Sequence, residues 1–99
     1  MDIKINSVHF DADQKLIALI NKKLTKLAQF FDGIISAEVF LRLEKVQSDE
    51  NKIVEIKLSI PGNDLFVKKQ SKTFEDAFNK GIESLSRQVT KHKEKLRNK

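Results

Sequence analysis

The sequence predicts one α+β domain of element order β-α-β-β-β-α, with a four-stranded sheet and two helices on one face of it. Two observations support this fold class. Apolar residues recur at helical spacing in two long segments and alternate with polar residues in four short ones. The length of 99 residues suffices for one hydrophobic core but not for two. We therefore expect residues 1–99 to form a single domain.

The chain opens with a short predicted strand, because polar and apolar residues alternate over residues 2–6. Asp11 or Asp13 can then cap a helix that runs to about Phe31. Gly33 follows, and glycine suits the left-handed position that often ends a helix. The apolar side of this helix consists of Leu16, Ile17, Ile20, Leu24, Leu27 and Phe31.

Three further strands are predicted in a meander. Residues 36–46 and 52–60 alternate with a period of two. Pro61 and Gly62 then form a tight turn, and residues 65–70 form the last strand. The side chains expected to face the core from the first two of these strands are Ala37, Val39, Leu41, Leu43, Val54, Ile56, Leu58 and Ile60.

The last predicted element is a long helix from Phe74 to about Leu96, with Thr73 as its N-cap. Its apolar residues repeat at helical spacing and should face the sheet. They are Phe74, Phe78, Ile82, Leu85, Val89 and Leu96.

Positive charge is sorted onto one side of each predicted helix. The net charge is +5 and the isoelectric point is about 9.5, so the protein should be attracted to polyanions. At ~100° per residue, the basic side chains of the first helix fall within roughly 40° of one another around the helix axis, and those of the second within roughly 80°. They are Lys15, Lys22 and Lys26 on the first helix, and Lys80, Arg87, Lys91 and Lys95 on the second.

These two basic ridges predict contact with a phosphate backbone. Long cationic side chains at intervals of one turn can neutralise successive phosphates and release counterions. Because lysine is a point charge and arginine is scarce, we expect recognition by shape and charge without reading of base edges. The alternative interpretation is that these lysines only keep two surface helices solvated.

Phe40 and Phe66 are predicted to face outward on neighbouring strands. They could form a platform on which bases stack, and the nearby Arg42, Lys57 and Lys68 keep that possibility open. We favour a small apolar cluster or a protein contact on this open face of the sheet.

The sequence offers nothing that predicts an enzyme. It has no cysteine, and neither His9 nor His92 has a second ligand at metal-binding spacing, so we expect no metal site. We find no nucleophile motif and no glycine-rich loop before a helix, and therefore expect no catalytic residue, cofactor or small-molecule substrate. Without an apolar membrane span or a signal peptide, the protein is expected to avoid membranes and to be cytoplasmic.

Three segments resemble one family, the ribosome hibernation promoting factors, which include the ribosome-associated inhibitor A type. They are Lys-Leu-Ala-Gln-Phe-Phe-Asp-Gly-Ile at 26–34, Val-Phe-Leu-Arg-Leu-Glu-Lys-Val at 39–46 and Arg-Gln-Val-Thr-Lys-His-Lys-Glu-Lys-Leu at 87–96. The similarity follows the chain in order from end to end.

The resemblance implies a ribosome-binding domain of the predicted fold. It implies a stress-response protein that is monomeric off the ribosome and binds the small ribosomal subunit in the mRNA and tRNA channel near the decoding centre. There it would contact ribosomal RNA, inhibit translation and preserve idle ribosomes. Carried over by position, the resemblance implies RNA contacts at seven residues of this sequence. The basic ridge of the second helix adds Lys80 to them. The seven are Lys22, Lys23, Lys26, Arg87, Lys91, Lys93 and Lys95.

Two departures keep alternatives open. Longer members carry a further C-terminal domain that pairs ribosomes, so pairing by this chain would need another factor. At residues 68–72 the chain has Lys-Lys-Gln-Ser-Lys where members often have acids. That cluster is similar to the one opening the second helix of double-stranded RNA-binding domains, so a general double-stranded RNA-binding module is an alternative. Such domains, however, begin with a helix. A third alternative, a protein-interaction module using Phe40 and Phe66, predicts no salt-sensitive RNA binding.

Overall fold

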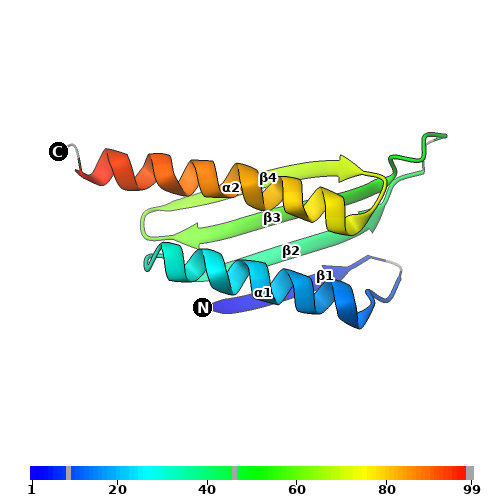
Figure 1. The fold of residues 1–99 in the computed structure, drawn as a ribbon, viewed down its shortest axis with the longest axis horizontal. Coiled ribbons are helices and arrows are strands. Elements are labelled where there is room, and N and C mark those ends of the chain that lie inside the picture. The colour runs from blue at the N-terminus through cyan, green and yellow to red at the C-terminus, as the bar shows by residue number, and fades with distance from the viewer. Residues whose placement is uncertain (9, 46, 98–99) are drawn as a thin grey trace.

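The six predicted elements all form, in the predicted order (Figure 1). The computed structural model describes residues 1–8, 10–45 and 47–97. Its elements are β1 (Asp2–Ser7), α1 (Gln14–Phe30), β2 (Ser36–Leu43), β3 (Lys52–Ile60), β4 (Asn63–Ser71) and α2 (Phe74–Arg97).

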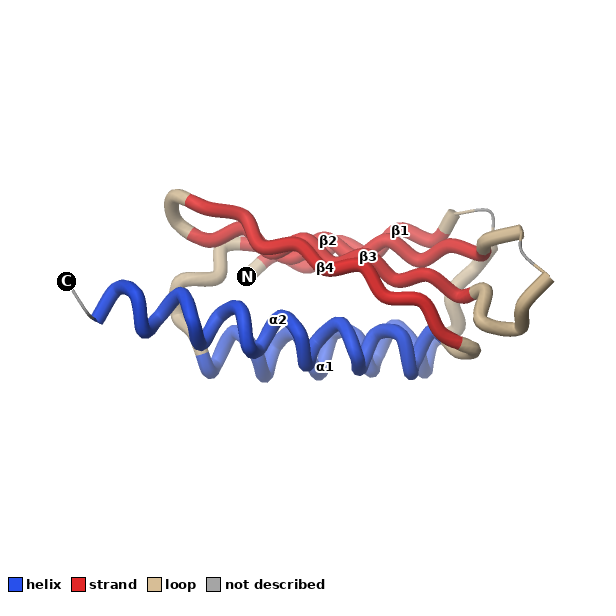
Figure 2. The backbone as a smooth tube through the Cα atoms, turned by 90° about the horizontal axis from the view of Figure 1, so that it is seen from above, coloured by secondary structure: helices blue, strands red, loops and turns tan. Residues whose placement is uncertain are grey.

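The strands form one sheet in the order β1-β2-β3-β4, so β1 and β4 are its edges. Strand β1 runs parallel to β2, as a crossover through α1 requires, while the other pairs are antiparallel hairpin partners. Both helices cover the same face, and the other face carries no helix (Figure 2). The predicted α+β fold class is therefore confirmed.

Helix α1 begins and ends close to the predicted residues, but no left-handed glycine follows it. The Asp13 carboxylate accepts a hydrogen bond from the Leu16 backbone N–H at 2.8 Å, which satisfies one of the free donors of the first turn. Its last helical residue is Phe30, and the C-cap residue Phe31 has an extended backbone with φ of −138°. The prediction that Gly33 takes a left-handed conformation is wrong, because Gly62 is the one glycine with positive φ.

Glycine at position 33 is explained by packing against its neighbour. A Cβ atom there would lie 2.9 Å from Cζ of Phe31, which is closer than real Cβ contacts allow. The Phe31 ring is buried, so it has little room to give. Gly62, by contrast, has φ of 75° in the tight turn between β3 and β4, where the left-handed region favours glycine.

The core lies between the helices and the sheet and is built from the predicted stripes. Fully buried members come from both helices and the two central strands. They include Ile20, Leu24, Val39, Leu41, Ile56, Leu58, Phe78, Leu85 and Val89, all with no exposed surface.

Leu43, Ile17 and Ile82 are less buried than the sequence predicts. Leu43 is 50% exposed at the end of β2, which stops there although a strand to residue 46 was expected. Val46 lies outside the described residues. Ile17 is 36% exposed at the edge of the stripe on α1. Ile82 is only half-buried, because it lies at the seam between the two helices. The side chain of Leu96 also lies outside the described part of the chain.

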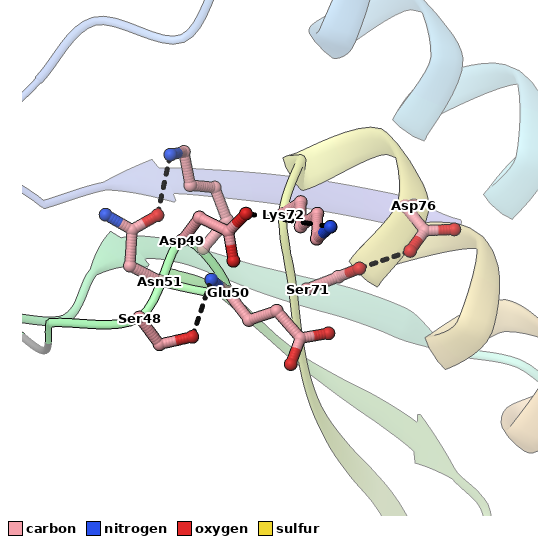
Figure 3. A network of polar contacts seen from close by, with 8 residues as sticks. Ser48, Asp49, Glu50, Asn51, Ser71, Lys72 and Asp76 are labelled. Carbon is pink, nitrogen blue, oxygen red and sulfur yellow. Dashed lines mark hydrogen bonds and ion pairs between the residues drawn. The ribbon is translucent and has the colours of Figure 1, made fainter.

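The junction of β4 and α2 is held by side-chain hydrogen bonds. Thr73 caps α2 as predicted, since its hydroxyl accepts from the Asp76 backbone N–H at 3.0 Å. The buried Ser71 hydroxyl donates to the Asp76 carboxylate (Figure 3). That hydrogen bond, together with the ammonium of Lys80, lowers the pKa of the Asp76 carboxyl below its ordinary value.

Replacing Ser71 with alanine should raise the pKa of Asp76 toward its ordinary value, because the hydrogen bond from Ser71 is the largest cause of the shift. A carboxyl with a lowered folded-state pKa adds stability above its unfolded-state pKa, and that stability is lost as pH falls through the folded value. The variant should therefore show a smaller acid-dependent loss of stability. Carboxyl NMR titration and acid unfolding measure both effects, with Ser84→Ala, on the helix that carries Asp76, as control. An unchanged pKa of Asp76 in the Ser71 variant would contradict this account.

Candidate nucleic-acid interface

The candidate interface is the helical surface that faces away from the sheet. Its basic side chains are exposed on both helices, as predicted from periodicity. On α1 these are Lys15, Lys22 and Lys26, and on α2 they are Lys80, Arg87, Lys91 and Lys95. Lys91 and Lys95 also border a hollow of about 630 Å³ between α2 and the start of β4.

Two of these cations are already paired with carboxylates one turn earlier on α2. The Lys80 ammonium lies 3.2 Å from Asp76, and the Arg87 guanidinium lies 3.5 Å from Glu83. Exposed pairs of this kind are weak, yet they reduce the charge offered to a ligand. Five of these cations form no ion pair within the described residues, so they offer less compensated charge than Lys80 and Arg87. They are Lys15, Lys22, Lys26, Lys91 and Lys95. Lys15 and Lys95 lie in the terminal turns of their helices, and we call the other three lysines, Lys22, Lys26 and Lys91, the free basic strip.

Two other members of the predicted set lie at the seam between the helices. Lys23 is half-buried and lines a groove there. The half-buried Lys93 of α2 donates a hydrogen bond to the Phe30 carbonyl at 3.2 Å. That carbonyl belongs to the last turn of α1, where carbonyls lack helical partners and cations are favourable. Lys93 thus ties α2 to the C-terminal end of α1.

Phe30 is a residue of this surface that the sequence reasoning missed. The residue is 52% exposed, and the Lys93 ammonium lies 4.8 Å from the ring centroid. The signal was present in the sequence as two consecutive phenylalanines at the end of a helix. Because neighbouring helical residues point about 100° apart, only one of the two could join the core, and Phe31 does.

The outer face of the sheet offers less to a nucleic acid. Phe66 is 55% exposed and Phe40 is half-buried. Strand β3 lies between the strands that carry them, so the prediction that these two strands are neighbours is wrong. Two of the nearby cations are paired. The contacts are Arg42 to Glu55 at 2.7 Å and Lys57 to Asp64 at 3.7 Å. This pattern favours the interpretation that the face is not a stacking platform.

The lysine cluster at residues 68–72 does not open the second helix. Lys68 and Lys69 belong to the edge strand β4, and Lys72 lies 3.6 Å from the Asp49 carboxylate (Figure 3). The first turn of α2 is acidic instead, with Glu75 and Asp76, which suits the positive end of the helix dipole. We therefore expect the start of α2 to be a poor site for phosphate.

Other kinds of site find no support in the described ranges. Within residues 1–8, 10–45 and 47–97, no three His, Cys, Asp or Glu side chains come together as a group that could hold a metal ion. In the same part of the chain, no helix has the length and apolar character needed to cross a membrane. The His92 ring packs edge-on against Phe31 with centroids 6.0 Å apart, in keeping with a structural role. His9 lies outside the described residues.

The fold and this surface define a two-layer α+β domain with one basic helical face. The chain belongs to the family described as sigma 54 modulation protein / S30EA ribosomal protein, whose model matches residues 3–97. The sequence-based resemblance to hibernation factors is thereby confirmed.

Its relatives include proteins named ribosome hibernation promoting factor. The one from Pseudomonas putida KT2440 is 30% identical over 95 residues, covering 96% of this chain and 89% of the relative. The one from Escherichia coli K12 is 29% identical over 97 residues, covering 98% of each chain.

Two solved structures share the fold. A ribosomal subunit interface protein from Coxiella burnetii superimposes with a TM-score of 0.84 at 22% identity, over 94% of this chain and 98% of its own. The N-terminal domain of Thermus thermophilus Protein Y gives a TM-score of 0.79 at 24% identity, over 93% and 99%.

Proposed function

We propose that this protein is a ribosome hibernation factor. It binds the small ribosomal subunit through ribosomal RNA, in the mRNA and tRNA channel near the decoding centre. Its bound state inhibits translation and preserves idle ribosomes. It works as one ribosome-binding domain in the cytoplasm, monomeric until it docks, and it acts by occupancy without catalysis. The names of its relatives support the hibernation role.

The observation that carries the proposal is the free basic strip on the helical face. Lys22, Lys26 and Lys91 lie on two adjacent helices, are exposed, and lack ion pairs within the described structure. Cations held on rigid helices can neutralise phosphates at fixed positions, which selects a folded RNA by the spacing of its backbone. The ribosomal RNA of the small subunit provides such a fixed surface.

The alternative of a general double-stranded RNA-binding module is disfavoured by the start of α2. In that alternative the lysine cluster would present cations at the opening of the second helix. Here that opening carries Glu75 and Asp76, and Lys72 is engaged by Asp49.

Binding selectivity tests the proposal directly. At one salt concentration, the protein should bind isolated small ribosomal subunits more tightly than duplex RNA of mixed sequence. The expected ratio is on the order of 10³ or more, as for specific over nonspecific nucleic-acid binding. Filter binding measures both affinities, and sedimentation of stationary-phase lysate on a sucrose gradient should place the protein with ribosomal particles. Equal affinities for subunit and duplex would favour the general module.

A further inference from the structure

A groove runs along the seam between the last turns of α1 and the middle of α2. Its volume of about 370 Å³ falls at the low end of the ~300–1,000 Å³ typical of ligand pockets. Its lining comes from both helices. The lining residues are Lys23, Lys26, Leu27, Phe30, Ile82, Ser86 and Thr90.

The floor of this groove is apolar, and its rim is cationic and hydroxylic. Leu27 is buried, and Ile82 is half-buried because it faces this seam. Lys23 and Lys26 stand on the α1 side, while Ser86 and Thr90 stand on the α2 side. None of the lining residues is acidic. The groove thus offers an apolar surface to a flat ring system and positive charge to an anionic group attached to that ring.

Phe30 supplies an aromatic surface at the same place. The Lys93 ammonium lies over the ring, and half of the side chain stays exposed. Phe30 and Thr90 also line a smaller hollow of about 240 Å³ together with Lys93 and Glu94, so the ring can be approached from more than one side. The hydrogen bond from Lys93 to the Phe30 carbonyl holds this part of the wall in place.

We propose that this groove binds one unstacked nucleotide of single-stranded RNA, with its base against Phe30 and the apolar floor and its phosphate at Lys23 and Lys26. A flat base attached to an anion matches both halves of the groove, and aromatic side chains hold splayed-out bases in this way. A duplex keeps its bases stacked inside and cannot enter. The inference deepens the proposed function, on which it rests, by naming the kind of ribosomal RNA contact.

Phe30 variants test this inference. Phe30→Ala should weaken binding to a short single-stranded RNA of mixed sequence by about 5- to 150-fold, the range for losing one stacked base. Binding to small subunits should weaken in the same range, while binding to the duplex formed with the complementary strand should not change. The salt dependence should stay the same, because no charge is removed. Phe66→Ala removes a similarly exposed ring from the opposite face and should bind like the parent.

A second variant keeps an aromatic ring and reports on it. The sequence contains no tryptophan or tyrosine, so Phe30→Trp introduces one fluorophore against a dark background. Its emission should be quenched when the single strand is added and remain unchanged with the duplex. Parental affinity of Phe30→Ala for the single strand, or unquenched Phe30→Trp, would overturn the inference.

The two proposals can fail separately. If the parent binds single strands through Phe30 but does not bind small subunits, the groove stands and the hibernation proposal fails. If the parent binds subunits and Phe30→Ala binds them equally well, the hibernation proposal stands and the groove is not a nucleotide site. Circular dichroism of each variant shows whether the fold is retained.

Discussion

Replacing Lys22, Lys26 and Lys91 together with alanine is expected to weaken binding to the small ribosomal subunit by about 100- to 500-fold at about 0.1 M salt. Each lost phosphate contact lowers the slope of log affinity against log salt by about 0.7 to 0.9. Three lost contacts should therefore reduce the slope by about 2 to 3. All three side chains are exposed, so stability should change little. Affinities measured over a range of salt concentrations give both quantities, and inhibition of translation should fall in parallel.

A matched control separates local contact from overall charge. Lys4, Lys57 and Lys68 are exposed on the outer face of the sheet, and replacing them with alanine removes the same positive charge. This variant should keep a nearly parental salt slope. Glu83→Gln should bind at least as tightly as the parent, because it releases Arg87 from its ion pair. If the sheet variant loses as much affinity as the helix variant, general attraction explains binding and the helical face is not the contact.

Among alanine substitutions of the described core residues, Phe78→Ala is expected to give the largest loss of stability. Phe78 has no exposed surface and is the largest fully buried side chain in the described core. Removing a buried phenylalanine ring costs about 3–5 kcal/mol, through lost transfer free energy and the cavity left behind. Small domains have total stabilities of about 5–15 kcal/mol, so the variant should unfold at a much lower urea concentration.

The control for this variant is the same substitution at an exposed position. Phe66→Ala removes an identical group from a side chain that is 55% exposed, and should change the free energy of unfolding by about 0.5 kcal/mol or less. Urea unfolding followed by circular dichroism compares the two. Equal losses at both positions would contradict the assignment of the core to the helical face of the sheet.

The sequence predicted those features of the fold that depend only on residues close together in the chain. Strand β3 matches its predicted bounds, and Thr73 and Asp13 cap the helices as their side-chain chemistry suggests. Exposure of the two basic ridges followed from helical periodicity, because the helix face opposite a buried apolar stripe is exposed to solvent.

What the sequence could not predict depends on how elements meet. Periodicity places Ile82 on the apolar side of α2 but does not say that a groove remains between α1 and α2 at that position. The seam between these helices brings Lys93 to the end of α1, where it donates a hydrogen bond to the Phe30 carbonyl, 63 positions away in sequence. Likewise, alternation assigns Phe40 and Phe66 to one face of the sheet without saying that β3 lies between them.

The open edges of the sheet bear on how the protein behaves at high concentration. An edge strand presents unpaired backbone groups that can template association with other chains. Strand β1 spans six residues, which limits the length of such a template. Strand β4 spans nine, and it carries Lys68 and Lys69, whose side chains project to opposite faces of the sheet beside its open edge. Two copies joining edge to edge at β4 would bring these charges together, so mutual repulsion opposes fibrous assembly. We therefore expect Lys68 and Lys69, which belong to the lysine cluster of residues 68–72, to oppose association of separate copies at this edge.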